Sequence, residues 1–326
     1  MNSDAARGLA WGMLGVLIFA LTMPMTRLAV GDQTAPQLPP AFVTAGRAGL
    51  AGLASLLYLW VVGGRRLVAP PKALWPLLAI SAAGTVVGFP LGLAVALREV
   101  PAMHASVVTG VLPLATAVVA ALALRQRASA GFWLCAVAGC ALVVAFALIA
   151  GGGRLVGADA WLALAVVSAA VGYVAGARAS AELPPEQVIC WVLVLSLPLT
   201  LPAMGLSRPA GGASAAAAVS WAAWAGFAYV TLFSMWLGFF AWYRGLALGG
   251  VLRVSQMQLA QPFLALLAAV PILGERLEPP TVGFALAVVA VVFVGKRMPL
   301  GAPRSAPATA ATSRPSRPSR STGARA

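Results

Sequence analysis

Long apolar runs dominate the chain, and short polar stretches separate them. A helix needs roughly 20 apolar residues to cross a bilayer core about 30 Å thick. Ten runs approach or reach that length, near residues 8–30, 42–62, 74–97, 103–124, 131–150, 159–178, 187–206, 219–243, 252–273 and 281–297. The runs are continuously apolar rather than alternating, which favours helices over membrane strands. The pattern predicts an all-α integral membrane protein with ten transmembrane helices.

Composition supports this class. Of the 326 residues, 61% are hydrophobic and only 9% are charged, whereas about a quarter of the residues in a soluble domain are charged. Arg7 precedes the first run, as in a signal peptide, but the run exceeds the usual apolar length and no small-x-small cleavage site follows it. We therefore expect an uncleaved first span.

The net charge of +14 comes from Lys and Arg at the ends of the runs and in the tail, which indicates topology signals rather than a nucleic-acid partner. With the N-terminus inside, the outer loops keep only Arg98, Arg154, Arg208 and Arg276. Both termini are therefore expected to be cytoplasmic. Residues 299–326 are rich in Pro, Ser, Ala and Arg and contain no acid, so we expect a disordered basic tail.

The two halves of the chain repeat each other at a nearly constant offset. Ser106, Pro113 and Arg127 recur 149 positions later as Ser255, Pro262 and Arg276, and Trp11, Gly88 and Phe89 recur 150 later as Trp161, Gly238 and Phe239. Because each half holds an odd number of spans, the second must enter the membrane inverted. We expect one five-helix repeat over residues 1–150 and another over 151–298, with a cavity between them.

Several motifs resemble those of the EamA-type drug/metabolite transporters. They are Thr-Ala-Gly-Arg-Ala-Gly-Leu around Arg47, Val-Leu-Pro-Leu around Pro113, Gln261-Pro262, and Leu-Gly-Glu-Arg at 273–276. The resemblance covers residues 8–297 and implies a ten-helix fold, placement in the inner membrane, and movement of amino acids or other small metabolites, often outward. One departure is Arg125-Gln126-Arg127, where the family usually has Gly-Glu-Arg.

Polar residues inside spans are candidates for the transport pathway, because each must be satisfied away from lipid. Ser106, Thr109, Pro113 and Thr116 share one helical face by their spacing, and Ser255, Gln258, Pro262 and Ala265 are their counterparts. With Gln261 beside that face, the predicted substrate-binding residues are Gln258, Gln261, Thr109, Ser106, Ser255, Arg47 and Tyr173. Bonds to neighbouring helices are the alternative for the amides and hydroxyls. For Arg47 the alternatives are snorkelling to the interface and pairing with another helix.

Titratable residues bear on energy coupling. All eight acids lie in loops or at span ends, which argues against a pump driven through a buried carboxylate. His104 is the sole histidine, the side-chain type that suits proton coupling, but its place near the outer end of span four favours an interfacial role. Arg27 is expected to anchor span one at the interface.

Glycine spacing and cysteine placement complete the picture. Gly84, Gly88 and Gly92 form two successive small-xxx-small steps, which predict close helix packing. Cys135, Cys140 and Cys190 lie in apolar runs and are expected to act as small hydrophobes.

The sequence thus favours a transporter, either an exporter or a facilitator, that moves a small organic metabolite through a cavity between the two halves. An intramembrane enzyme or lipid-modifying protein is the alternative, and a structural or sensory protein is a third. No Walker loop, His-Glu-x-x-His helix, Gly-x-Ser-x-Gly elbow or Cys/His cluster is present, so we expect no enzymatic activity, cofactor or metal. The expected partners are a small-molecule substrate and the lipid bilayer, without nucleic acid, and a homodimer is compatible with the sequence.

Overall fold

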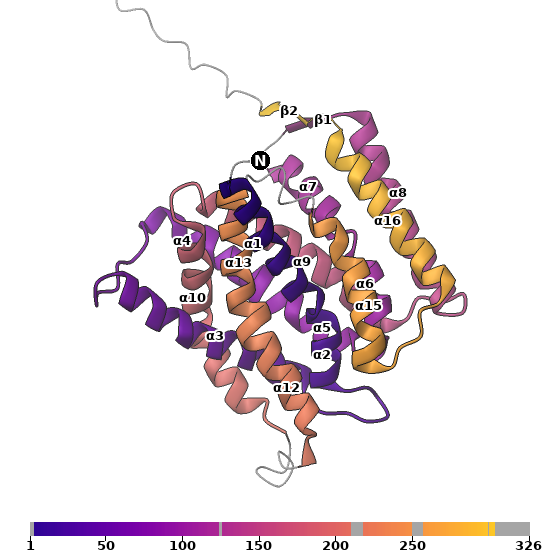
Figure 1. Ribbon diagram of the computed structural model, residues 1–326, viewed down its shortest axis with the longest axis horizontal. Coiled ribbons are helices and arrows are strands. Elements are labelled where there is room, and N and C mark those ends of the chain that lie inside the picture. Colours follow the sequence, from indigo (N-terminus) through magenta and orange to yellow (C-terminus); the bar gives the residue numbers. More distant parts are fainter. Residues whose placement is uncertain (1–2, 124–125, 210–217, 250–256, 299, 304–326) are drawn as a thin grey trace, which may run out of the picture.

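The computed structural model describes residues 3–123, 126–209, 218–249, 257–298 and 300–303, and helices make up most of them (Figure 1). The first half holds α1 (Ser3–Ala20), α2 (Thr22–Val30), α3 (Pro40–Val62), η1 (Lys72–Leu74), α4 (Trp75–Ser81), the π-helical segment η2 (Ala82–Gly88), α5 (Phe89–Ala96), α6 (Ala102–Thr109), α7 (Leu112–Ala123) and α8 (Ala130–Ala150). The second half holds α9 (Gly157–Ala179), α10 (Pro185–Leu206), α12 (Trp221–Tyr229), the π-helical segment η3 (Val230–Leu237), α13 (Gly238–Gly249), η4 (Met257–Ala260), α15 (Gln261–Leu273) and α16 (Pro279–Arg297).

Two short strands, β1 (Gln126–Ala128) and β2 (Leu300–Pro303), pair antiparallel. They join the segment before α8 to the segment after α16, and these two helices lie side by side (Figure 1). The apolar pattern did not predict these strands.

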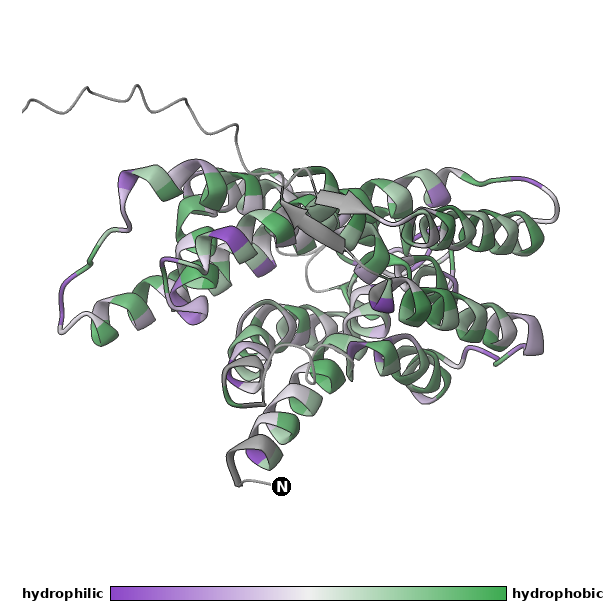
Figure 2. Ribbon diagram, turned by 90° about the horizontal axis from the view of Figure 1, so that it is seen from above, coloured by the Kyte–Doolittle hydropathy of each residue, from purple (hydrophilic) through white to green (hydrophobic). Residues whose placement is uncertain are grey.

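Eight helices of the described residues are long and apolar enough to cross a membrane: Ala6–Val30, Pro40–Val62, Lys72–Ala96, Ala102–Ala123, Ala130–Ala150, Gly157–Ala179, Pro185–Leu206 and Trp221–Gly245. Two shorter apolar helices, Met257–Leu273 and Pro279–Gly295, fall on the last two predicted runs. Hydrophilic ribbon is found mainly at helix ends and in loops (Figure 2). The prediction of an all-helical, multi-pass membrane protein is confirmed.

Large apolar side chains face outward along the spans. Leu134 and Val137 of α8 are 70% and 66% exposed, and Leu57 of α3 is 61% exposed. Apolar surface of this extent is unstable in water and is typical of a face covered by lipid.

Prolines interrupt several spans that the apolar runs represent as single helices. The first span breaks at Leu21, three residues before Pro24, and the fourth breaks between α6 and α7, just before Pro113. In the third span η2 comes directly before α5, whose second residue is Pro90. Proline has no backbone N–H and its ring clashes with the carbonyl four residues earlier, so regular α-helix is lost at these points.

The predicted glycine steps pack the third span against α9. A Cβ added at Gly88 would lie 2.7 Å from the Ser168 Cβ, and one added at Gly92 would lie 2.7 Å from the Trp161 carbonyl oxygen. Only glycine leaves room for so close an approach. The prediction of close packing along this stripe is confirmed.

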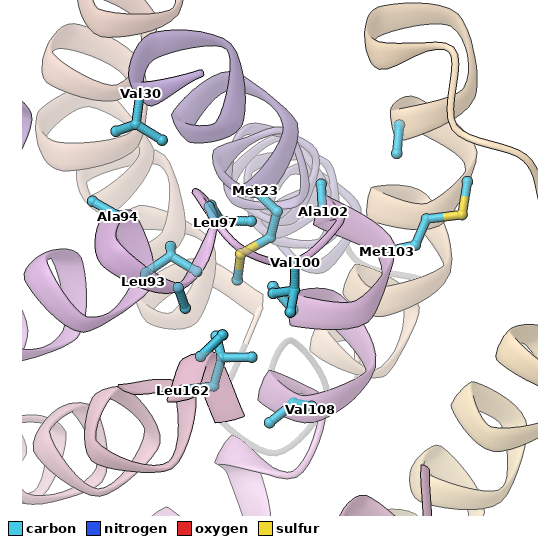
Figure 3. Packing of buried hydrophobic residues seen from close by; sticks show 14 of the residues in the cluster. Met23, Val30, Leu93, Ala94, Leu97, Val100, Ala102, Met103, Val108 and Leu162 are labelled. Carbon is cyan, nitrogen blue, oxygen red and sulfur yellow. The ribbon is translucent and has the colours of Figure 1, made fainter. Parts of the chain in front are cut away.

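One apolar core lies where α2 and α5 end and α6 begins. Met23 and Leu93 pack there with Val100, Val108 and Leu162 of α9 (Figure 3). Each of these five side chains is at most 6% exposed. The bundle is therefore filled at this end.

Candidate functional site

A cavity of about 370 Å³ lies between the helices, and residues from both halves of the chain line it. Six of the seven residues predicted to bind substrate are among its lining: Arg47, Ser106, Thr109, Tyr173, Gln258 and Gln261. The seventh, Ser255, lies outside the described residues. Their role in binding stays a prediction, but the structure brings the six to one place.

The helical face predicted for the fourth span also lines the cavity, with its counterparts in the ninth. Pro113 and Thr116 lie in the lining from the fourth span, and Pro262 and Ala265 from the ninth. The two short helices α7 and α15 thus present corresponding faces to the same space.

The hydroxyls of this face donate within their own helix. Ser106 Oγ donates to the Ala102 carbonyl and Thr109 Oγ1 to the Ala105 carbonyl, both at 2.7 Å. Among the described residues, neither hydroxyl bonds a neighbouring helix. The alternative that these hydroxyls serve only to bond neighbouring helices is therefore not supported for Ser106 and Thr109. Each oxygen keeps lone pairs that can accept a hydrogen bond from a bound molecule.

The two glutamines leave their amides available. Gln261 is the first residue of α15, and Gln258 lies one turn earlier, in η4. Within the described segments, neither amide has a hydrogen-bond partner, and both side chains are half-buried. Each amide offers two N–H donors and a carbonyl acceptor.

Arg47 is buried, not extended to the interface. Its side chain is 3% exposed, and Nη2 donates to Ser234 Oγ at 3.0 Å. Ser234 Oγ lies in turn 2.8 Å from Thr22 Oγ1. The snorkelling alternative is therefore wrong, whereas the other alternative, pairing with another helix, describes this bond to Ser234 of η3 at the cavity wall.

Sequence reasoning missed Ser234, although a signal was present. Ser234 stands 149 positions after Thr85, at the same offset that relates Ser106 to Ser255. Thr85 and Ser234 both line the cavity, from η2 and η3. Applying the repeat offset to every polar residue within a span would have found the pair.

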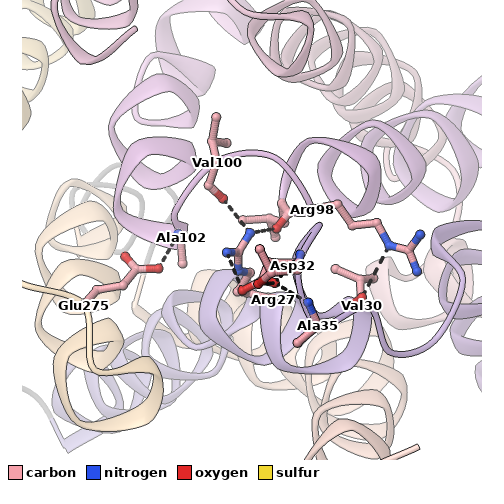
Figure 4. Close-up of polar contacts among 10 residues, drawn as sticks. Arg27, Val30, Asp32, Ala35, Arg98, Val100, Ala102 and Glu275 are labelled. Carbon is pink, nitrogen blue, oxygen red and sulfur yellow. Dashed lines mark hydrogen bonds and ion pairs between the residues drawn. The ribbon is translucent and has the colours of Figure 1, made fainter. Parts of the chain in front are cut away.

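Polar contacts join several segments at one end of the bundle (Figure 4). We call these contacts the polar closure and this end the Arg27 end. The Arg27 guanidinium donates to the carbonyls of Leu97 and Val100. The Glu275 carboxylate accepts from the backbone N–H groups of Ala102 and Met103, at 2.6 and 2.9 Å. Arg27 thus ties α2 to the segment between α5 and α6, and Glu275 ties α6 to the loop after α15.

Arg98 and Asp32 extend this closure. Arg98 donates to the carbonyls of Val30 and Leu38, each at 3.3 Å, and partial burial lowers its pKa. Hydrogen bonds, chiefly from the Thr34 hydroxyl, lower the pKa of Asp32, which also pairs with Arg27 at 3.5 Å. Arg27 is therefore more than the interface anchor expected, because it joins three segments of the chain.

His104 is buried, and the expected interfacial role is wrong. The side chain is 6% exposed, and its Nε2 lies 2.7 Å from Asp159 Oδ1. The other Asp159 oxygen accepts from the Val156 N–H at 2.9 Å, at the start of α9. Asp159 does lie at a span end, as predicted, but its burial opposite a histidine was not foreseen.

The cavity extends toward the other end of the bundle, which we call the Ser180 end. Its lining includes Ser180, the residue that caps the C-terminus of α9, and Tyr243 of α13. The lining also includes Met23, which belongs to the core cluster around Leu93.

No group of three or more His, Cys, Asp or Glu that could hold a metal ion occurs among the residues that the structure describes. Cys135, Cys140 and Cys190 are free thiols.

Known proteins match this chain along most of its length. The model of the EamA-like transporter family matches residues 6–149 and again residues 156–295. The uncharacterized transporter YdeK of Bacillus subtilis (strain 168) is 42% identical over 290 residues, which cover 88% of this chain and 96% of that protein. A solved crystal structure, 18% identical, matches with a TM-score of 0.59 over 89% of this chain and 96% of its own, a likeness in fold. The chain belongs to the EamA-like transporter family.

Proposed function

We propose that this protein is a transporter, either an exporter or a facilitator, and that it moves a small organic metabolite such as an amino acid by alternating access. In this proposal the ten helices form two inverted five-helix repeats, residues 1–150 and 151–298. The protein lies in the cell inner membrane, with both termini cytoplasmic. The observation that carries the proposal is a cavity lined by residues of both halves, together with the polar closure that joins the two halves at one end of the bundle.

Helix contacts support the inverted repeat. The first span packs against the eighth through α1 and α13, and the third packs against the sixth through α5 and α9. In a two-fold exchange of the halves, the first span takes the place of the sixth and the third takes the place of the eighth, so one of these contacts becomes the other. It maps three further contacts onto themselves: α3 with α10, α6 with α15, and α8 with α16. The π-helical segments η2 and η3 occupy corresponding places in the third and eighth spans, and the two family matches have nearly equal lengths.

Alternating access needs two arrangements of the halves around one site. The polar closure joins α6 of the first half to the loop after α15 of the second half, through Glu275. Separating these groups opens the Arg27 end. With the N-terminus inside, this is the outer end, so the described arrangement corresponds to a state closed toward the outside.

The enzyme alternative gains no support from the site. The lining offers hydroxyls, amides and one guanidinium, but no carboxylate, histidine or cysteine among the described residues. A general base or metal ligand of the usual kinds is therefore not part of the described cavity wall.

The test compares cells that express the wild type with cells that carry the empty vector. Metabolites that accumulate in the medium only with the wild type identify the cargo. Gln258→Leu, Gln261→Leu and Thr109→Val should then reduce efflux of that cargo while membrane abundance stays normal. Normal abundance with unchanged efflux for all three variants would remove the proposed pathway, and no cargo at all would remove the proposed function.

A further inference from the structure

The cavity holds a positive charge that no acid of the described residues balances. Arg47 is the sole charged residue in the described lining, and it is 3% exposed. The ion pairs found in the described segments join Arg27 to Asp32 and His104 to Asp159, so none includes Arg47. An arginine side chain keeps its charge in proteins, and an unbalanced buried charge is costly enough that its usual explanation is function.

Part of the Arg47 hydrogen-bonding capacity is also unused. Nη2 donates to Ser234 Oγ, but the buried Nε has no hydrogen-bond partner among the described residues. Ser234 is itself held by Thr22 at 2.8 Å, so the guanidinium is fixed from the side of η3. The fixed guanidinium therefore carries an unbalanced charge and an N–H donor that is unpaired among the described residues.

A bound carboxylate would both balance the Arg47 charge and accept hydrogen bonds from its guanidinium. The planar guanidinium matches a carboxylate with two parallel hydrogen bonds, and the pair is stronger than one between neutral groups. The remaining polar lining is neutral, with the amides of Gln258 and Gln261 and the hydroxyl of Tyr173. Phe89, Phe239 and Trp242 add aromatic walls. One charge surrounded by neutral and aromatic groups suits a molecule with one carboxylate and a partly apolar body.

We propose that the substrate carries a carboxylate, that Arg47 binds it directly, and that the cavity rejects cations that have no carboxylate. This inference rests on the proposed function, because it concerns the molecule that passes through the same cavity. A cationic amine would meet the Arg47 charge without a described carboxylate to offset the repulsion. A zwitterion remains a substrate, since its ammonium can bond the glutamine carbonyls.

The test is binding of matched probes to the purified full-length protein, read as a rise in the midpoint of thermal unfolding. The probes share one phenyl body and differ in charge: 3-phenylpropionate, L-phenylalanine, 3-phenylpropanamide and phenethylamine. An aliphatic series, 4-methylpentanoate with its amide and amine, controls for body size. In each series we expect the carboxylates to raise the midpoint and the amide and amine to leave it unchanged.

Variants then assign the effect to Arg47. Arg47→Gln can still bond Ser234 but has no charge, and should reduce carboxylate binding at least tenfold, whereas Arg47→Lys should retain part of it. Arg178→Gln, on the exposed last turn of α9 and outside the lining, is the matched control and should bind as the wild type does. If Arg47→Gln does not fold, the probe series on the wild type still tests the need for a carboxylate, and full carboxylate binding by Arg47→Lys with no loss would overturn the role of Arg47.

Three results would overturn the inference: equal stabilisation by amines or amides, no stabilisation by any carboxylate, or full carboxylate binding by Arg47→Gln. Efflux profiling separates this failure from failure of the proposed function. If the wild type exports only molecules without a carboxylate, the proposed transporter function stands and the inference of a carboxylate substrate is wrong. A wild type that exports nothing rejects both.

Discussion

Replacing Glu275 with Gln should open the Arg27 end. The carboxylate accepts two backbone hydrogen bonds, from Ala102 and Met103, at the N-terminus of α6. Hydrogen bonds to a charged group are worth about 1.5–3 kcal/mol each, and the helix dipole adds about 0.3–1 kcal/mol for a negative charge at this position. Because glutamine keeps one acceptor oxygen, we expect the closed state to lose about 1.5 kcal/mol, at the low end of that range. Since 1.4 kcal/mol is a factor of ten, the open fraction should rise roughly tenfold.

Thiol labelling measures this fraction. In a background with the three native cysteines replaced by alanine, Ser106→Cys places a thiol on the cavity wall, one helical turn after Ala102, the residue that bonds Glu275. An impermeant thiol reagent added at the Arg27 side should modify it about tenfold faster when Glu275→Gln is present. Glu278→Gln, three residues away on the exposed start of α16 with no side-chain capping bond, is the matched control. Equal labelling rates for Glu275→Gln and its parent, at normal abundance, would refute the proposed role of Glu275 in the closure.

Three further predictions follow from the packing, the charge distribution and the loop after α2. Gly88→Ala should lower the stability of the purified protein by about 1–3 kcal/mol, because the new Cβ would lie 2.7 Å from Ser168. Gly205→Ala, where nothing lies within 4 Å of the new Cβ, is the control. Equal unfolding midpoints for the two variants would contradict the packing argument. Reporter fusions after Arg208 should read as external and fusions at the C-terminal tail as cytoplasmic, and the reverse result at either place would overturn the topology. The pKa of Asp32 is lowered from 3.8, so its carboxylate should keep accepting from the backbone N–H groups of Thr34 and Ala35 at pH values above 3.8. These hydrogen bonds should be lost only as the pH falls through the lowered pKa. Faster hydrogen exchange at these two amides already near pH 5 would contradict this prediction.

The spans were predictable because their signal is local. A run of apolar residues of sufficient length indicates a membrane helix wherever it occurs, and the Gly84, Gly88 and Gly92 spacing indicates a packed face. The breaks before Pro24, Pro90 and Pro113 were not predicted, since an apolar count treats proline as one more residue within the run.

Part of the candidate site was predictable from helical spacing and from the repeat. Ser106 and Thr109 share a face with the period of a helix, and their counterparts led to Gln258. The polar closure was not predictable, because Arg27 bonds backbone carbonyls about 70 positions away and these leave no mark on side-chain identity. His104 and Asp159 are 55 positions apart. Both were placed at span ends, and His104 was given an interfacial role. Only tertiary packing determined that they are buried together.

Access to the cavity from both sides of the membrane tests the central claim most directly, and it needs no knowledge of the substrate. A single cysteine at Thr109, in the background without native cysteines, lies on the cavity wall within the fourth span. Impermeant thiol reagent should modify it quickly from the Ser180 side and slowly, but measurably, from the Arg27 side, and Glu275→Gln should increase only the second rate. Modification from one side alone, unchanged by Glu275→Gln, would contradict alternating access through this cavity.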